Sequence, residues 1–214
     1  MTVVGDSHEC MQVSHSLRNS NMNMEDTRQS MEEIMTKAFG KTLERCKTAI
    51  SAGMHITRWN ESVFRFFFCQ SLCETDSNIV QHVECNKIDL VLHAGSDVAF
   101  IEFKFYIHSP VFDPCSGKRK HSRKSFPSEK NYKNFSDCVS QLKKRRCDRQ
   151  PSKFLVLFYA DPVEENRMTY ASLYEKRRSS DQTLGLKEVC KEEPFCIKQF
   201  DGSVIKCCAW VFAV

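Results

Sequence analysis

Residues 153–161, KFLVLFYAD, form an apolar run with hardly a polar interruption. A strand with one face in water alternates apolar and polar residues, whereas a strand covered on both faces does not. A chain containing such a strand must supply a layer of structure on each side of it. The run therefore predicts a sheet packed between helices.

Three further strand-like runs precede this one, at residues 78–84, 87–93 and 98–106. The first two are separated only by Cys85-Asn86, and the gap before the third contains Ala94-Gly95-Ser96-Asp97. Links this short are typical of hairpins. We therefore expect the three runs to pair as an antiparallel meander.

Apolar residues at helical spacing predict helices over residues 25–50, 58–73, 134–147 and 168–179, and a final strand is expected at 204–214. The resulting order is helix, three strands, helix and strand, followed by an extra C-terminal helix and strand. This order predicts an α/β fold with a mixed sheet flanked by helices.

The helix ends are predicted from capping residues. Asp26 or Thr27 is expected to cap the first helix, Asn60 the second and Ser136 the third, and Gly40 marks an interruption within the first. The apolar residues expected on the buried faces are Met31, Ile34, Met35, Ala38, Leu43, Val63, Phe67, Phe135, Val139 and Leu142.

The chain of 214 residues is long enough for one covered core and too short for two large domains. Residues 1–26 are rich in Ser, Asn, Met and His without periodicity, which predicts a flexible tail before a single domain at 27–214. No signal-peptide pattern or long apolar stretch is visible. We expect no membrane contact and an intracellular, cytoplasmic protein, or a nuclear one in a eukaryotic host.

Twelve cysteines occur without a single CxxC pair, which argues against a structural zinc site and is consistent with reduced thiols. Cys69 and Cys73 lie four residues apart on a predicted helix. They could share a metal ion or be buried as small apolar residues.

Positive charge is concentrated in one part of the chain. The net charge is +4, but residues 117–149 contain twelve Lys or Arg and only three acids, so the remainder is net acidic. A local positive field of this kind suits a polyanion, and nucleic acid is the natural candidate. A solvated loop and a nuclear localisation signal are alternatives.

The strand at 98–106 carries charge on one face only. Alternation places Glu102 and Lys104 on the face opposite Ile101 and Phe103. In the preceding strand, Ile88, Leu90 and Leu92 form the apolar set and leave Asp89, Val91 and His93 on the other face. If the apolar faces lie together, Asp89 shares a face with Glu102 and Lys104. The alternative is an ordinary solvent-facing side of a strand.

Two neighbouring carboxylates repel unless a proton or a cation lies between them, and their hard oxygens select Mg²⁺ or Mn²⁺. A lysine beside them can orient a water molecule or stabilise charge on a phosphate. Asp89, Glu102 and Lys104 therefore suit metal-assisted hydrolysis of a phosphodiester.

These residues resemble the PD-(D/E)xK nuclease superfamily, which has the restriction-endonuclease-like fold. Its motif places an Asp on one strand and Glu or Asp, any residue, and Lys on the next, as in KIDLVL with Asp89 and IEFKF with Glu102 and Lys104. The family's αβββαβ core matches the predicted order from about residue 55 to 161. Ile88 stands where the family usually has Pro, and Arg145 stands where some branches have Tyr.

The resemblance implies a Mg²⁺-dependent nuclease, most simply an endonuclease acting on DNA. Asp89, Glu102 and the backbone carbonyl of Phe103 would bind Mg²⁺, or Mn²⁺ in its place, and Lys104 would orient the attacking water. Glu61, on the first core helix, would support the metal, and Gln141 on the later helix could contribute to catalysis. The phosphate-binding residues would be Lys118, Arg119, Lys120, Arg123, Lys124, Lys143, Lys144, Arg145 and Arg146, partly within a basic insertion at about 113–133.

Other functions remain open at the level of sequence. A non-catalytic nucleic-acid-binding or protein-interaction module on the same scaffold is the main alternative. A metal-independent RNA-cleaving relative and an unrelated α/β protein are others. A homodimer is plausible for a nuclease, because cutting both strands requires two sites.

Overall fold

The computed structural model describes residues 29–54, 59–108, 111–113, 116, 118–120, 127–163, 169–180, 184–198, 202 and 204–214. The predicted tail at 1–26 lies outside these residues. The helices are α1 (Met31–Ser51), α2 (Glu61–Thr75), α3 (Glu129–Lys144) and α4 (Tyr170–Ser180). The strands are β1 (Val80–Cys85), β2 (Ile88–Ala94), β3 (Asp97–Ile107), β4 (Val111–Asp113), β5 (Lys118–Lys120), β6 (Ser152–Pro162), β7 (Lys187–Lys198) and β8 (Val204–Ala213).

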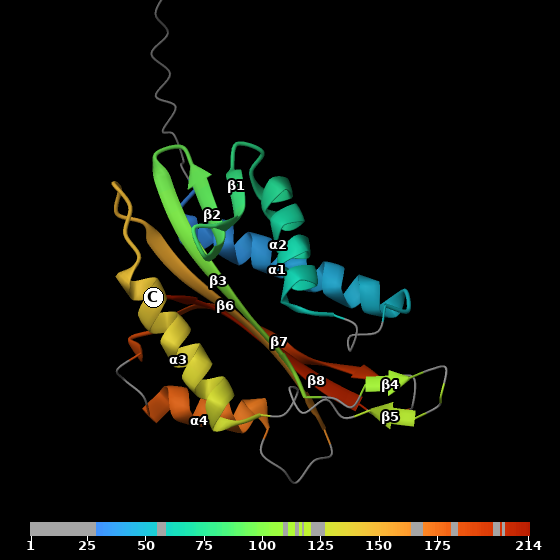
Figure 1. Cartoon of the computed structure of the whole chain (residues 1–214). Helices are drawn as coiled ribbons and strands as arrows, with labels where there is room; N and C mark the ends of the chain where they lie inside the picture. The colour runs from blue at the N-terminus through green and yellow to red at the C-terminus, as the bar shows by residue number, and fades with distance from the viewer. Residues whose placement is uncertain are drawn as a thin grey trace, which may run out of the picture.

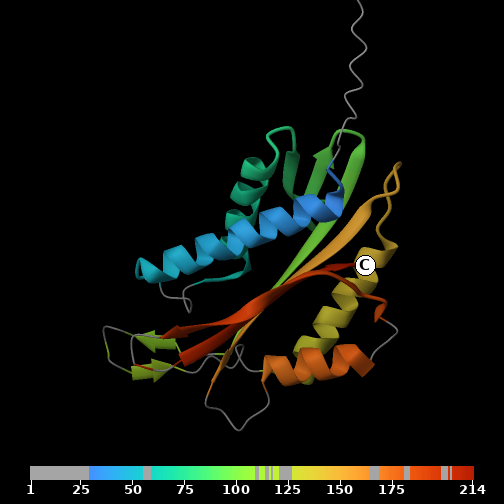
Figure 2. The same ribbon diagram turned by 180° about the vertical axis from the view of Figure 1, so that it is seen from behind.

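A six-stranded sheet in the order β1-β2-β3-β6-β8-β7 forms the centre of the molecule. Strands β3 and β6 are parallel and the other neighbours are antiparallel, so the sheet is mixed. Helices α1 and α2 cover one face and α3 and α4 the other (Figure 1), as the opposite view also shows (Figure 2). The predicted α/β fold with a mixed sheet flanked by helices is confirmed. Within the described part of the chain, no helix has the length and apolar character needed to cross a membrane.

Strand β6 contributes to the core on both sides of the sheet. Phe154, Val156 and Phe158 pack toward α1 and α2, whereas Leu155 and Leu157 pack in the cluster with α3 and α4. Every residue from 154 to 161 is buried. The prediction of a strand covered on both faces is therefore confirmed.

Helices α1 and α3 are capped by residues other than those predicted, and the candidates for α1, Asp26 and Thr27, lie outside the described residues. Helix α1 begins after Ser30, whose side chain accepts from the Glu33 amide while the Glu33 carboxylate accepts from the Ser30 amide. This reciprocal pair satisfies two backbone donors, and α1 then continues through Gly40 without interruption. Helix α3 is capped by Ser128, so Ser136 lies inside it.

The buried face of α2 differs from the predicted one. Asn60 caps the helix as predicted, but its fully buried apolar residues are Phe64, Phe68 and Leu72. Val63 and Phe67 are only partly buried. Nearly every position from 63 to 68 is apolar, so spacing alone did not distinguish one stripe from its neighbour.

The meander of β1, β2 and β3 is confirmed, but Ile88 does not share a face with Leu90 and Leu92. It packs instead with Val91 and Phe100. The backbone near the β1–β2 turn is left-handed at Glu84, Asn86 and Lys87, with φ of 53°, 51° and 63°. Regular alternation therefore does not extend to the start of β2.

Three strands were not predicted from the sequence. Strand β7 is an edge strand that reads KEVCKEEPFCIK, and its pairing with β8 is interrupted between Glu188 and Cys190 and between Glu192 and Phe195. Charge and a proline are typical of edge strands, and the interruptions remove the period of two. The other two, β4 and β5, pair as a short hairpin, with β4 at the start of the basic insertion and β5 within it.

Replacement of Phe64 by Ala tests how α2 is held on the sheet. Phe64 is 1% exposed and contacts the rings of Phe103, Phe105 and Phe158. Its loss leaves a cavity, so the variant should lose about 3–5 kcal/mol in the free energy of unfolding measured with urea. Phe66→Ala, at a position 58% exposed on the same helix, should change it by about 0.5 kcal/mol or less. Equal effects would contradict this assignment of the buried face.

Candidate active site

The site begins where β2 and β3 stop pairing. The last paired residues in this direction are Leu90 and Ile101. Beyond them the backbone amide of Phe103 donates to Oδ2 of Asp89 at 2.8 Å. The Asp89 carboxylate therefore accepts the hydrogen bond that a carbonyl of the neighbouring strand would otherwise accept. It lies at the opening between the two strands.

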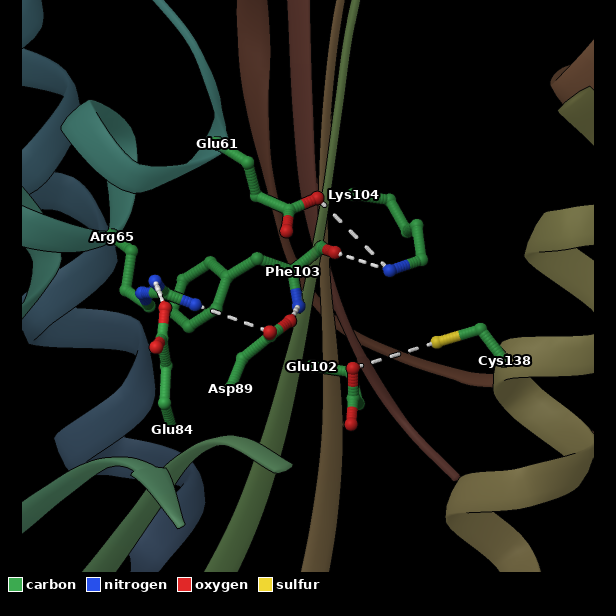
Figure 3. A network of polar contacts seen from close by, with 8 residues as sticks. All are labelled: Glu61, Arg65, Glu84, Asp89, Glu102, Phe103, Lys104 and Cys138. Carbon is green, nitrogen blue, oxygen red and sulfur yellow. Dashed lines mark hydrogen bonds and ion pairs between the residues drawn. The ribbon is translucent and has the colours of Figure 1, made fainter. Parts of the chain in front are cut away.

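Strand β3 directs its alternate side chains to different layers. Phe103 is fully buried against Phe64 and Phe68 of α2. Its neighbours Glu102 and Lys104 point away from that layer (Figure 3). The burial of Phe103 therefore fixes the direction of both charged side chains.

Glu102 lies between Asp89 and helix α3. Its carboxyl group is close enough to that of Asp89 for a hydrogen bond when one of them is protonated. On the other side, the Cys138 thiol donates to Oε2 of Glu102 at 3.8 Å. The predicted juxtaposition of Asp89 and Glu102 is thus present.

Lys104 joins the strand to the start of α2. Its Nζ donates to the backbone carbonyl of Phe103 at 2.7 Å and lies 4.0 Å from Oε2 of Glu61. Glu61 is the first residue of α2, directly after the cap Asn60, whose Oδ1 accepts from the Val63 amide at 3.0 Å. The cap therefore sets where Glu61 stands relative to the sheet.

Arg65 is a member of the site that the sequence analysis missed. Its Nη1 donates to Oδ1 of Asp89 at 3.1 Å and its Nη2 to Oε1 of Glu84 at 2.6 Å. The residue is only 7% exposed. An arginine within the apolar run VFRFFF needs an acidic partner if it is buried, and that signal was available in the sequence.

Burial and mutual repulsion perturb the acids of the site. Desolvation, followed by the nearby charge of Asp89, raises the pKa of Glu102 to about 7. Desolvation also raises the pKa of Glu61, although Lys104 opposes the shift. For Lys104, burial alone would lower the pKa, but Cys138, Glu61, Asp89 and Glu102 together raise it. The ammonium of Lys104 is therefore held in its charged form.

The available donors fit a hard cation. Asp89, Glu102 and Glu61 offer carboxylate oxygens, and Phe103 offers its backbone carbonyl. Among the described residues, no three His, Cys, Asp or Glu side chains form a complete metal-ligand cluster. Mg²⁺ is commonly held by one or two carboxylates together with waters and substrate phosphate, so two carboxylates and a carbonyl suffice for it.

The remaining predicted residues are Gln141 and the basic residues expected to bind phosphate. Gln141 is exposed on α3, and the α3 residue that contacts Glu102 is Cys138, one turn earlier. Lys143 and Lys144 form the last turn of α3, followed by Arg145 and Arg146. Lys118, Arg119 and Lys120 form β5, whereas Arg123 and Lys124 lie outside the described residues.

Comparison with protein-family models, curated proteins and solved structures found no match.

The raised pKa of Glu102 predicts a stability change with pH. Because this pKa lies near 7 in the folded chain and near 4.5 in the unfolded one, wild-type stability should fall as the pH rises through this window. Glu102→Gln removes the charge, so at pH 8 its free energy of unfolding should be about 1–2 kcal/mol greater than that of the wild type. This is less than the full pKa shift would imply, because the carboxyl group is partly solvated. The advantage should vanish near pH 4.5.

Urea unfolding at several pH values measures this difference, with Glu193→Gln at an exposed position on β7 as the matched control. A Glu102→Gln advantage that is independent of pH would contradict the shift.

Loss of Arg65 should destabilise the chain, because Asp89 would remain partly buried without its cation. We expect Arg65→Ala to cost about 3 kcal/mol in urea unfolding and Arg65→Lys to cost less, since it keeps the charge. Arg45→Ala breaks the more exposed pair with Glu74 and should cost clearly less than Arg65→Ala, because water screens an exposed ion pair. Similar losses for Arg65→Ala and Arg45→Ala would contradict the larger contribution expected from the buried Arg65 network.

Proposed function

We propose that this chain is a divalent-metal-dependent nuclease of the PD-(D/E)xK type that hydrolyses phosphodiester bonds in DNA. The observation that carries the proposal is the meeting of Asp89, Glu102, Lys104 and the Phe103 carbonyl where β2 and β3 separate. Two acids and a lysine from two different strands meet here, which the ordinary solvent-facing side of a single strand would not explain.

The order of elements supports a restriction-endonuclease-like core. The series α2-β1-β2-β3-α3-β6 follows the αβββαβ order, with β1, β2 and β3 antiparallel and β6 parallel to β3. Strands β8 and β7 extend the sheet beyond β6, and helices α1 and α4 add to its opposite faces.

Asp89, Glu102 and the Phe103 carbonyl would hold Mg²⁺ or Mn²⁺, with Glu61 in support. When bound, the ion supplies Lewis acidity and a more acidic water molecule. The neighbouring acids raise the pKa of Lys104 against the effect of burial, which favours a role as a donor to a water or a phosphoryl oxygen. Arg65 holds Asp89 in position through its Oδ1.

The basic residues at the end of α3 favour nucleic acid as the substrate. Lys143, Arg145, Arg146, Arg149 and Lys153 line one hollow of about 580 Å³, with Asp148 as its acidic member. Contacts of this kind add affinity for phosphates without reading sequence.

Incubation of the purified protein with plasmid, single-stranded DNA or RNA tests the proposal. Cleavage of DNA should require Mg²⁺ or Mn²⁺ and stop with EDTA. Asp89→Asn and Lys104→Ala should lower the rate by about 10² or more, since each removes a group that acts on the reacting phosphate. Lys87→Ala, an exposed lysine in the β1–β2 turn, is the control.

A second readout does not depend on turnover. Mn²⁺ should raise the melting temperature of the wild-type protein and of Lys87→Ala, but not of a chain with both Asp89→Asn and Glu102→Gln. Binding of DNA without cleavage under every metal condition would refute the nuclease and favour a non-catalytic binding module. Cleavage that survives EDTA would refute the metal dependence.

A further inference from the structure

A second hollow, of about 490 Å³, lies between β2, β3 and the segment that follows α3. Its floor is apolar and its rim is basic. The floor residues are Cys85, Ile88, Val91, Val98 and Phe100, and the rim residues are Asn86, His93, Arg145, Arg146, Cys147, Asp148 and Arg149. A concave apolar surface with a few polar groups at its edge is the usual form of a ligand site.

The rim segment, residues 145–149, is tied to the hairpin that it faces. Nη1 of Arg149 donates to the Ser96 carbonyl at 3.0 Å, in the turn between β2 and β3. The Cys147 thiol donates to the Arg149 carbonyl at 2.8 Å. The same segment lines both this hollow and the basic one that contains Lys143 and Lys153. Apolar and cationic surfaces therefore lie on either side of one short stretch of chain.

The apolar hollow is next to the candidate active site on the same face of the sheet. Phe100 precedes Glu102 by two residues on β3, a separation of about 7 Å along the strand. Leu142 follows Cys138 by one turn of α3 and packs in the cluster with Phe100. The strand and the helix both lead from Glu102 and Cys138 to the hollow.

We infer that this hollow binds one unstacked nucleobase of the substrate strand, with the adjoining phosphates on Arg145, Arg146 and Arg149. The inference rests on the proposed function and extends it, because a base held here has left its duplex. The preferred substrate is then a single-stranded or locally unpaired segment.

Chemistry favours a nucleotide over a purely apolar ligand. The arginines of the rim outnumber its one acid, Asp148, so the edge attracts an anion. Burial lowers the pKa of Lys153, and the positive charge of Arg146 lowers it further. The cations of this segment therefore repel one another. An apolar floor accepts the face of any base, and guanidinium planes stack on bases as well.

The test compares two oligonucleotides in EDTA, so that binding is measured without cleavage. One is the octamer of thymidylate, and the other is an octamer with the same phosphates and abasic sugars. The wild-type protein should bind the first at least tenfold more tightly, because only the first has bases. A ratio near one between the affinities for the thymidylate and abasic octamers would overturn the inference.

Filling the hollow should abolish the difference. Cys85→Phe, at a partly exposed position, and Val98→Phe should bring the ratio toward one while affinity for the abasic octamer is kept. Val83→Phe, at a position 52% exposed on β1 and outside the hollow, should keep the full ratio. A full ratio in folded Cys85→Phe or Val98→Phe would overturn the inference.

A measurement on the unaltered chain guards against variants that do not fold. At equal occupancy, the thymidylate octamer should slow alkylation of Cys147 more than the abasic one, with exposed Cys73 on α2 as internal reference. Equal protection by the two would overturn the inference. If the protein binds the thymidylate octamer more tightly but shows no metal-dependent cleavage, only the nuclease proposal is refuted. If it cleaves DNA but binds both octamers equally, only the nucleobase site is refuted.

Discussion

The hydrogen bond from the Phe103 amide to the Asp89 carboxylate is the contact on which the site depends. It replaces a ladder hydrogen bond where β2 and β3 separate, so the backbone donor stays satisfied while the strands open. The same carboxylate accepts from Arg65, which fixes both of its oxygens. Because Phe103 is buried against α2, Glu102 and Lys104 are directed to the opposite side. One short contact thus couples the opening of the sheet to the placement of three charged residues.

Charge balance explains why such a site is compatible with a folded core. Among the described residues, the acids Glu61, Glu84, Asp89 and Glu102 share the cations Arg65 and Lys104. Desolvation by burial, together with the negative charge of Asp89, raises the pKa of both Glu102 and Glu61. A hard divalent cation would relieve the surplus of negative charge, because it favours the charged carboxylates. The electrostatics and the choice of oxygen donors therefore support the same kind of ligand.

The surface beside the site has a matching character. Helix α3 contributes Cys138 to the site and Leu142 to the apolar cluster that contains the floor residue Phe100, and the arginines of the rim follow its end. A strand of nucleic acid placed along this face would contact acids and a lysine at one point and an apolar, arginine-edged hollow at the next. The position of this one helix relative to β3 sets the spacing between the two.

The sequence alone determined the layers and the pair of motif strands. Uninterrupted apolar character in β6 required two covered faces, and alternation in β3 separated Phe103 from Glu102 and Lys104, because both patterns depend only on local periodicity. Only the tertiary structure decided that Asp89 meets the Phe103 amide, that Arg65 is buried with it, and that Cys138 is the α3 residue at Glu102. It also revealed β7 and the caps Ser30 and Ser128. These features depend on strand register and on which of several adjacent apolar or capping residues packs best, and such choices are made by contacts between residues distant in the chain.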